Sequence, residues 1–362
     1  MTAIRVAVPE PYDVLVGRGL LDGLPELLKE HCPAVSYAVI ADEHVAQLHG
    51  ARLLTLLVGA GLDAKCFTFP AGEWNKNREQ WAGLTDRLLA WGLGRDGAII
   101  AFGGGVAGDL AGFVAATFLR GIPYAQVPTS LLAMIDSSVG GKTGLDAPAG
   151  KNLVGAFHQP RVVVADVDLL ATLPRSHIAA GVAEAIKHGV ILDAAYFDSL
   201  ADAAACFAKD PARLEAVVRR SIEIKAGVVS DDERESGRRQ ILNFGHTIGH
   251  AVETLSGFDL LHGEAVAIGM AVETQIAEVL GVAEPGTRKA VVALLGRYGL
   301  PCAIPSGLDA SRLLALMGAD KKVRERRVRC ALPKKVGLMV QSDDGAWTVE
   351  VAEEVLREAI SL

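Results

Sequence analysis

The chain has 362 residues, 50% of them hydrophobic and 22% charged, a composition typical of a folded protein long enough for two domains. A formal net charge of −7 argues against nucleic acid as a partner, because binding to nucleic acid usually needs a basic surface. No apolar run is long enough to cross a membrane, and the five cysteines include no CxxC pair, so we expect a cytoplasmic protein with reduced cysteines and no membrane partner.

Short β-branched runs alternate with segments of helical period in the N-terminal half. This alternation predicts an α/β layer with a largely parallel sheet. The expected strands are Ile4–Val8, Asp13–Val16, Tyr37–Ile40, Lys65–Phe69, Ala98–Phe102 and Arg161–Asp166, and the expected helices are Leu20–Lys29, Val45–Gly59 and Arg78–Trp91.

A glycine-rich sequence, GGGVAGDLAGF, follows the strand predicted at Ala98–Phe102. Gly103, Gly105 and Gly108 have GxGxxG spacing, which lets the backbone approach a pyrophosphate at a helix N-terminus. The acidic residue expected about 20 positions later is absent, so a strand-to-helix turn without a ligand explains the motif nearly as well. Asp42, at the end of an earlier strand, is the candidate for a ribose or adenine contact.

Two lysines follow in short glycine-rich sequences. Lys142 ends VGGK, and Lys151 precedes Asn152 in GKNLVGAF. Neither sequence is a Walker A motif, because Asp136 stands where its first glycine should be. We expect two short loops, which are either plain turns or a cradle for an anionic group.

Helical periodicity dominates from Ser176 onward, and Ser176 is expected to cap the first of these helices after Pro174. That helix carries Glu184 and Lys187 among apolar residues, which indicates an ion pair or a metal ligand, with the ion pair favoured on this helix alone. A strand hairpin is expected after the basic run DKKVRERRVR. The other expected helices are Leu214–Val229, Gln240–Leu255, Glu264–Leu280, Arg288–Tyr298, Ser311–Met317 and Val351–Ile360.

Histidines concentrate in the sequence NFGHTIGHAVE and just after it. His246 and His250 have the i, i+4 spacing of a helical metal site, but Thr247 replaces the glutamate of the metalloprotease motif HExxH. A third ligand could come from Glu184 or His262, and two histidines with one carboxylate are the composition of a catalytic zinc site. The alternative, ordinary hydrogen-bonded histidines, is weakened by their clustering.

Basic residues accompany the glycine-rich and histidine-rich segments. Taken singly, each is best explained as a solvated surface charge. Converging on one cleft, they would concentrate an anionic small molecule there. These residues are Arg120, Lys142, Lys151, Lys187, Lys225 and Arg239.

Motifs along nearly the whole chain, from about Asp42 to Gly337, together resemble the 3-dehydroquinate synthases of the shikimate pathway. They are GGGVAGDLAGF, FLRGI, PTSLLAMIDSSVGGKTG, GKNLVGAFHQP, GVAEAIKHG, RRQILNFGHTIGHAVE, HGEAVAIGM and the DKK run. The resemblance implies a Rossmann-like α/β domain at residues 1–174 and a mainly α-helical domain at residues 175–362. It places the active site in the cleft between them.

The resemblance also implies NAD and a divalent metal, zinc or cobalt, as cofactors of a homodimer that acts on an anionic sugar phosphate. The implied enzyme is a carbon–oxygen lyase that converts 3-deoxy-D-arabino-heptulosonate 7-phosphate to 3-dehydroquinate and phosphate. The implied steps are transient oxidation by NAD, phosphate elimination, re-reduction and intramolecular aldol closure. The implied metal ligands are Glu184, His246 and His262, which leaves His250 for the substrate.

Matching residue by residue assigns the remaining contacts. Arg120 would reach the substrate phosphate from the other subunit. The implied substrate pocket contains Asp136, Lys142, Asn152, Lys187, Lys225, Arg239, Asn243, His250 and Lys321. The implied NAD contacts are Asp42, Glu73, Lys76, Gly103, Gly104, Gly105, Val106, Gly108, Asp109, Thr129, Ser130, Lys142, Lys151 and Thr172.

The chain departs from the family pattern at a few positions without losing an implied ligand. Ser130 stands where threonine is common, Met134 and Ile135 where glutamine and valine are common, and Asp146 where asparagine is common. These departures affect only the fine geometry of the implied pocket.

Three other functions remain open. Related sugar-phosphate cyclases with inosose or valiolone products share NAD and metal, but Lys225, Arg239, Asn243 and His250 favour a substrate that bears a carboxylate. A metal-dependent alcohol or glycerol dehydrogenase would instead turn over NAD. A catalytically silent NAD-binding or metal-binding protein is weakly disfavoured by intact Lys142, Lys187 and Asn243.

Overall fold

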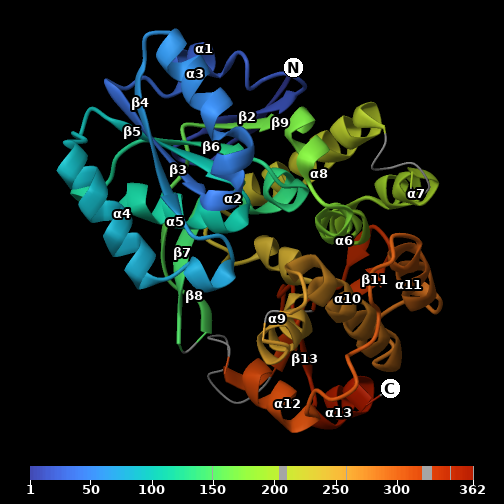
Figure 1. Cartoon of the computed structure of the whole chain (residues 1–362). Helices are drawn as coiled ribbons and strands as arrows, with labels where there is room; N and C mark the ends of the chain where they lie inside the picture. Colours follow the sequence, from blue (N-terminus) through green and yellow to red (C-terminus); the bar gives the residue numbers. More distant parts are fainter. Residues whose placement is uncertain (149, 204–209, 258, 320–327, 343, 362) are drawn as a thin grey trace. The chain divides into compact units, whose positions relative to one another are not determined.

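The chain divides into two compact units (Figure 1). The first contains Met1–Leu173 and Leu214–Ser230, and the second contains Pro174–Arg213 and Asp231–Leu362. The helix at 214–230 therefore belongs with the N-terminal unit, although it follows the predicted boundary between residues 174 and 175. The computed structural model describes residues 1–148, 150–203, 210–257, 259–319, 328–342 and 344–361.

A seven-stranded sheet in the order β1-β2-β9-β6-β5-β3-β4 forms the first unit. All neighbouring strands are parallel except the antiparallel pair β1 and β2 at one edge, which confirms the predicted sheet. The sequence did not predict β6, whose short run YAQVP contains a glutamine and ends in proline. The strands are β1 (Thr2–Val6), β2 (Tyr12–Gly17), β3 (Ser36–Asp42), β4 (Asp63–Phe69), β5 (Ala98–Gly103), β6 (Tyr124–Pro128) and β9 (Val162–Asp166).

Helices cover the faces of this sheet. Helix α4 has the predicted bounds: Asn77 Oδ1 accepts a hydrogen bond from Gln80 N at 3.0 Å, and left-handed Gly92 (φ 85°) ends the helix. Leu88 of α4 and Leu110 of α5 pack in one apolar core with strand residues of β3 and β5. The longer helices are α1 (Leu24–His31), α3 (Ala51–Gly59), α4 (Arg78–Trp91), α5 (Gly105–Thr117) and α8 (Pro211–Asp231), and α2 (Glu43–Val45) is a single turn.

The two glycine-lysine segments, predicted to be loops, instead form an antiparallel hairpin of β7 (Lys142–Ala147) and β8 (Gly150–Phe157). The prediction was wrong because β8 is half exposed along its length and contains glycines, so it lacks the apolar alternation of a strand. Gly144 and Gly155 face each other, and a Cβ on either would overlap the partner backbone. Lys142 begins β7, and Lys151 lies on β8.

The second unit is mainly helical, as predicted. Its short strands pair as β10 (Val328–Cys330) with β13 (Val349–Val351) and β11 (Pro333–Lys335) with β12 (Leu338–Met339). Helix α10 is buried over most of its length. The helices are α6 (Arg175–Leu192), α7 (Ala194–Ala203), α9 (His246–Leu255), α10 (His262–Val279), α11 (Thr287–Arg297), α12 (Ala310–Ala319) and α13 (Glu353–Ser361).

Two local predictions in this unit were wrong. Ser176 is not a cap, because α6 begins at Arg175 with Pro174 in the cap position. The helix predicted at 240–255 is interrupted: a short 3₁₀ helix, Arg238–Asn243, precedes left-handed Gly245 (φ 79°), and α9 starts at the next residue. A left-handed residue cannot continue an α-helix, so the regular spacing of polar residues concealed a break.

Among the described residues, no helix has both the length and the apolar content that a membrane span requires. Cys32, Cys66, Cys302 and Cys330 are free thiols. Cys206 lies outside the described residues.

Candidate active site

Strand ends of the first unit meet at the glycine-rich turn. Strands β3 and β4 extend the sheet on one side of β5, and β6 and β9 extend it on the other. Such a switch point, at the carboxyl ends of parallel strands, is where ligands bind in doubly wound folds. Asp42 ends β3 and Gly103 ends β5, and a Cβ added to Gly103 would lie 3.3 Å from Asp42 Oδ2. The candidate dinucleotide residues therefore share one edge of the sheet.

The turn itself allows a ligand to approach the backbone closely. Helix α5 begins at Gly105, and its cap residue Gly104 contributes no side-chain hydrogen bond. A Cβ on Gly103 would come within 2.6 Å of Ala107 Cβ, so the turn requires glycine there. Thr129 N donates to Gly103 O at 2.9 Å, which places the end of β6 beside the turn. The strand, turn and helix predicted around GxGxxG are confirmed, and the helix N-terminus can receive a phosphate.

A buried lysine ties together several predicted NAD contacts. Lys76 is 3% exposed, and its Nζ lies 2.9 Å from Glu73 Oε1 and 3.3 Å from Asp109 Oδ2. The same atom lies 2.8 Å from Asn152 Oδ1 and 3.6 Å from Asp146 Oδ1. We call these five residues the Lys76 cluster. It links the start of α5 to the β7–β8 hairpin.

Charge and burial act in opposite directions within the Lys76 cluster. Burial lowers the pKa of Lys76, but the surrounding carboxylates outweigh burial and raise it above its usual value, so the lysine stays cationic. Burial raises the pKa of Asp109 to about 6. Burial also acts to raise the pKa of Glu73, yet Lys76 and Lys151 lower it to about 2. Lys151 Nζ lies 3.1 Å from Glu73 Oε1, so four predicted NAD contacts form one network.

Two predicted substrate residues of the first unit also contact each other. Lys225 of α8 is 6% exposed, and its Nζ lies 2.7 Å from Asp136 Oδ1 and 2.6 Å from Asp136 O.

Thr172, a predicted NAD contact, pairs with another side chain in this structure: its Oγ1 lies 2.9 Å from His49 Nε2.

Arg120 lies in a strained segment. Leu119 (φ 49°) and Arg120 (φ 71°) are consecutive non-glycine residues in the left-handed region. Each such residue costs of the order of 1 kcal/mol and tends to persist where function requires it.

Glu184 is the centre of the second cluster, in the second unit. This carboxylate on α6 is fully buried, and its Oε1 lies 3.5 Å from His246 Nε2 and 3.5 Å from His262 Nε2. Its Oε2 pairs with Lys187 one helical turn later, as i, i+3 spacing allows. The position of Glu184 is therefore compatible with both roles predicted from the sequence, an ion pair with Lys187 and a metal ligand. Glu184, Lys187, His246, His250 and His262 form what we call the His cluster.

Close backbone contacts bring these residues together. A Cβ on Gly263, next to His262, would overlap the carbonyl oxygen of Ala180, one turn before Glu184 on α6. A Cβ on Gly269 of α10 would likewise overlap the carbonyl oxygen of Gly245, the residue before α9. Glycines thus let α10 contact both α6 and the start of α9 through the main chain.

Three histidine rings gather here. The centroid distances are 5.2 Å from His246 to His250, 5.5 Å from His246 to His262 and 5.8 Å from His250 to His262. These histidines each offer one nitrogen in a group that spans at most 4.8 Å, so they also could hold a metal. Ligand atoms held ~2.1 Å from a tetrahedral ion lie roughly 3.4 Å apart, and the 3.5 Å distances at Glu184 match that spacing.

His246 and His262, which both lie 3.5 Å from Glu184, have opposite pKa shifts. Burial, aided by Lys187, lowers the pKa of His246 to about 3, so this ring is neutral at pH 7, the form that binds metals. Burial also acts to lower the pKa of His262, but Glu184 and Glu253 outweigh it and raise the pKa to about 10. A metal bound at His262 Nε2 would replace that proton.

Arg239 and Asn243 lie on the short helix that precedes α9. Arg239 is 2% exposed, and it donates from N to Asp232 Oδ2 at 3.0 Å and from Nη1 to Glu233 O at 2.5 Å. Asn243 Nδ2 donates to Glu235 Oε1 at 2.5 Å. Lys321, the remaining predicted substrate residue, lies outside the described residues.

The sequence interpretation missed three carboxylates. Glu235 accepts from Asn243, and Glu253 lies 3.4 Å from His262 Nδ1. Fully buried Glu273 of α10 accepts from Gly245 N at 2.6 Å and from Ile248 N at 3.3 Å, and burial raises its pKa to about 8. A carboxylate in an apolar helix was the available signal for Glu273.

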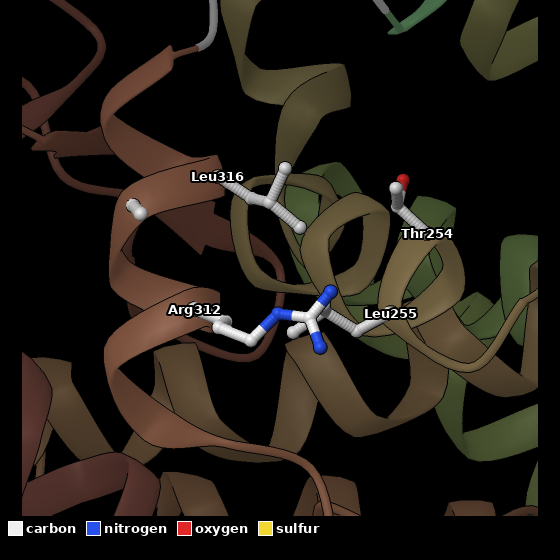
Figure 2. Close-up of a pocket in the computed structure, with 5 residues that line it drawn as sticks. Thr254, Leu255, Arg312 and Leu316 are labelled. Atoms are coloured by element: carbon white, nitrogen blue, oxygen red, sulfur yellow. The ribbon is translucent and has the colours of Figure 1, made fainter.

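A separate pocket of about 310 Å³ lies between α9 and α12 (Figure 2). Figure 2 shows the Arg312 side chain extending toward Leu255. The lining residues, none of which carries a carboxylate or an imidazole, are Thr254, Leu255, Arg312, Ala315 and Leu316. The chemistry-bearing residues are elsewhere, and the predicted position of the active site between the two domains stays a prediction.

Comparisons with known proteins agree with the motifs. Models of the 3-dehydroquinate synthase N-terminal and C-terminal regions match residues 66–180 and 181–323. The chain is 47% identical over 338 residues to a 3-dehydroquinate synthase of Symbiobacterium thermophilum, covering 92% of this chain and 94% of that protein.

Two solved structures are similar over nearly their whole length. A 2-deoxy-scyllo-inosose synthase complexed with carbaglucose-6-phosphate, NAD+ and Co2+ has a TM-score of 0.92 and 28% identity, covering 99% of each chain. The 2-epi-5-epi-valiolone synthase ValA of Streptomyces hygroscopicus subsp. jinggangensis, with NAD+ and Zn2+ bound, has a TM-score of 0.88 and 27% identity, covering 100% of this chain and 98% of that one. With both family models matching most of its length, the chain belongs to the 3-dehydroquinate synthase family.

Proposed function

We propose that this protein is a 3-dehydroquinate synthase, a lyase of the shikimate pathway. It converts 3-deoxy-D-arabino-heptulosonate 7-phosphate to 3-dehydroquinate and phosphate, and so serves aromatic amino acid biosynthesis. The observation that carries the proposal is 47% identity across 92% of the chain to a 3-dehydroquinate synthase.

NAD and a divalent metal ion, zinc or cobalt, are the proposed cofactors. When bound, the dinucleotide supplies reversible hydride transfer and the metal supplies Lewis acidity. The glycine turn at the switch point of the sheet supports the first, and the 3.5 Å distances from Glu184 to two histidines support the second. The similar inosose and valiolone synthases were crystallised with NAD+ and with Co2+ or Zn2+.

In this proposal the metal ligands are Glu184, His246 and His262, and His250 binds the substrate. The geometry alone also allows His250 as a ligand, because the three histidines lie together. The buried pair Lys187 and Glu184 keeps a positive charge beside the carboxylate and away from solvent.

The other residues bind and orient the substrate. Lys142, Asn152 and His250 are proposed to contact the substrate's phosphate. In this proposal the phosphate itself is the base for its own elimination, so these residues need to hold it in place. Lys225 and Arg239 are proposed to hold the carboxylate and hydroxyls. The Lys76 cluster fixes Asn152: Lys76 Nζ reaches its Oδ1, and Asp146 Oδ1 accepts from its backbone N at 2.8 Å.

A coupled assay tests the function. Purified protein with heptulosonate phosphate, zinc and a small amount of NAD+ should release phosphate over many turnovers without accumulating NADH. An absence of phosphate release would refute the synthase. Steady NADH formation with a simple polyol would identify a dehydrogenase instead.

A second candidate is a cyclase for a sugar phosphate without a carboxylate. It is favoured by the TM-score of 0.92 to the inosose synthase, although that likeness comes with only 28% identity. Glucose 6-phosphate serves as the test substrate. Phosphate release from it, but not from the heptulosonate, would select this alternative.

We also propose a cytoplasmic homodimer in which Arg120 reaches the phosphate in the partner's active site. The strained backbone at Leu119 and Arg120 supports a functional role for this arginine. Sedimentation velocity tests the dimer. Mixing Arg120→Ala with His246→Ala tests the exchange: mixed dimers would contain one intact site, so about a quarter of parent activity should return. No recovery on mixing would place Arg120 in its own subunit's site.

A further inference from the structure

The imidazole of His262 lies between two buried carboxylates. Its Nε2 lies 3.5 Å from Glu184 Oε1, on one side, and its Nδ1 lies 3.4 Å from Glu253 Oε2, on the other. Glu253 belongs to α9 and is 3% exposed, whereas His262 begins α10. The roles proposed above use Glu184 and leave Glu253 unassigned.

His246 has the same arrangement with a different partner. Its Nδ1 lies 3.1 Å from Phe244 O, and its Nε2 lies 3.5 Å from Glu184 Oε1. A carbonyl oxygen can only accept, so Nδ1 of His246 carries the hydrogen and Nε2 presents a lone pair. Both histidines thus turn the same nitrogen toward Glu184.

We infer that Glu253 is the positioning residue for His262. Its carboxylate accepts the Nδ1 hydrogen of the ring, which fixes the ring orientation and leaves Nε2 for a divalent cation. Such outer carboxylates make a histidine ligand more basic, and their loss typically weakens metal affinity by about 10–100-fold. The inference rests on the proposed function, in which His262 is a ligand.

The position of Glu253 on α9 strengthens this assignment. Its helix starts at His246 and carries Glu253 two turns later, so a single rigid element supplies one proposed ligand and the partner of another. Since α9 and α10 pack closely where Gly249 faces Ala265, the carboxylate has little freedom to move away from the ring.

Metal affinity of the purified full-length protein tests the inference. The metal is first removed with a chelator, and zinc is then titrated in competition with a chromogenic chelator. Glu253→Gln, which keeps the size of the side chain and removes its charge, should weaken zinc binding by about 10–100-fold and leave NAD+ affinity unchanged. Glu253→Asp, which retracts the carboxylate, should give an intermediate zinc affinity.

Glu264→Gln is the matched control. Glu264 lies in the first turn of α10, two residues after His262, but its Oε2 accepts a hydrogen bond from Leu261 N at 2.8 Å and not from a histidine. This variant should bind zinc like the parent. An equal loss of zinc affinity in both glutamine variants would overturn the inference. The weaker binding would then come from a disturbed start of α10 and not from the lost contact between Glu253 and His262.

The remaining outcomes separate the inference from the proposed function. A parent protein that binds no zinc would refute the proposed metal site itself. A parent that binds zinc while Glu253→Gln binds it equally well would refute only the role of Glu253. If Glu253→Gln fails to fold, Glu253→Asp decides: parent-like zinc affinity would then overturn the inference.

Discussion

The two buried clusters are built with opposite polarity. The Lys76 cluster has a cation at its centre and oxygen atoms around it, whereas the His cluster has the Glu184 carboxylate at its centre and nitrogen atoms around it. Both central side chains are almost fully buried. The first arrangement satisfies its central charge with protein groups, and it holds a hairpin against a helix. The second brings together the nitrogen and oxygen donors that divalent metals prefer.

The comparison shows that burial and ionisable groups do not by themselves distinguish a framework from a metal site. Removing the centre of the Lys76 cluster should mainly reduce stability, because three partly buried carboxylates would lose their cation. Removing a ligand from the His cluster should mainly reduce metal binding and activity.

The largest effect is expected from a ligand substitution. His246→Ala should abolish zinc binding and lower kcat by about 10³-fold or more, since a catalytic metal supplies several kcal/mol of transition-state stabilisation. His250→Ala is the matched variant, and it should keep its zinc while losing affinity for the substrate. Metal content measured on both purified variants checks this, and equal metal loss would show that His250 is a ligand.

The next effect is on folding. Lys76→Met should lower the free energy of unfolding by ~2–4 kcal/mol, because three partly buried carboxylates lose their shared cation. Asp146→Asn is the control: it removes one negative charge and keeps an oxygen to accept from Asn152 N, so its effect should stay below ~1 kcal/mol. Denaturant unfolding measures both, and a Lys76→Met protein as stable as the control would refute the framework role.

The free energy of unfolding is expected to depend on pH through Glu273, a buried carboxylate that accepts hydrogen bonds from backbone N–H groups. Burial raises its pKa from 4.5 to about 8. The folded state therefore holds this proton more tightly than the unfolded state. Its contribution to stability is complete below pH 4.5 and is lost as the pH rises through 8.

Glu273→Gln isolates this contribution, because glutamine stays neutral at every pH. The free energy of unfolding of the parent, relative to the variant, should fall by at most ~1.4 kcal/mol per pH unit across that interval and then level off. Unfolding curves at several pH values provide the measurement. Parallel profiles for the two proteins would contradict the raised pKa.

The smallest effect is expected at an exposed pair. Arg357 Nη2 lies 2.6 Å from Glu353 Oε1, but the two side chains are 52% and 64% exposed. Arg357→Ala should change the free energy of unfolding by less than ~0.5 kcal/mol. The same denaturant experiment checks it. A loss of stability as large as that of Lys76→Met would show that burial does not determine how much an ion pair contributes.

The sequence predicted those parts of the fold that have strong local patterns. The β-branched runs in β3 and β5 and the capped helix α4 were all found in their places. The β7–β8 hairpin was missed because its strands are held by close contact between Gly144 and Gly155, a tertiary property that leaves no apolar alternation. The break at Gly245 was missed because polar residues keep helical spacing across it.

The candidate site divides in the same way. Ligand types were visible in the sequence, and spacing alone suggested the pair His246 and His250. The sequence also named Glu184 and His262 as candidate ligands. The structure adds their positions: the ring centroid of His262 lies 5.5 Å from that of His246, and Glu184 Oε1 lies 3.5 Å from His246 Nε2. The positioning role inferred for Glu253 could not have been found from the sequence, because it depends on which nitrogen of His262 the carboxylate faces.

The glycine contacts of α10 make the spacing of the His cluster a property of the main chain. Neither Gly263 nor Gly269 leaves room for a methyl group against the carbonyl oxygens of Ala180 and Gly245. A designer who wished to transplant this site would therefore have to copy the crossing of three backbones before choosing any ligand. The surrounding apolar side chains could be redesigned more freely, as long as their total volume was kept.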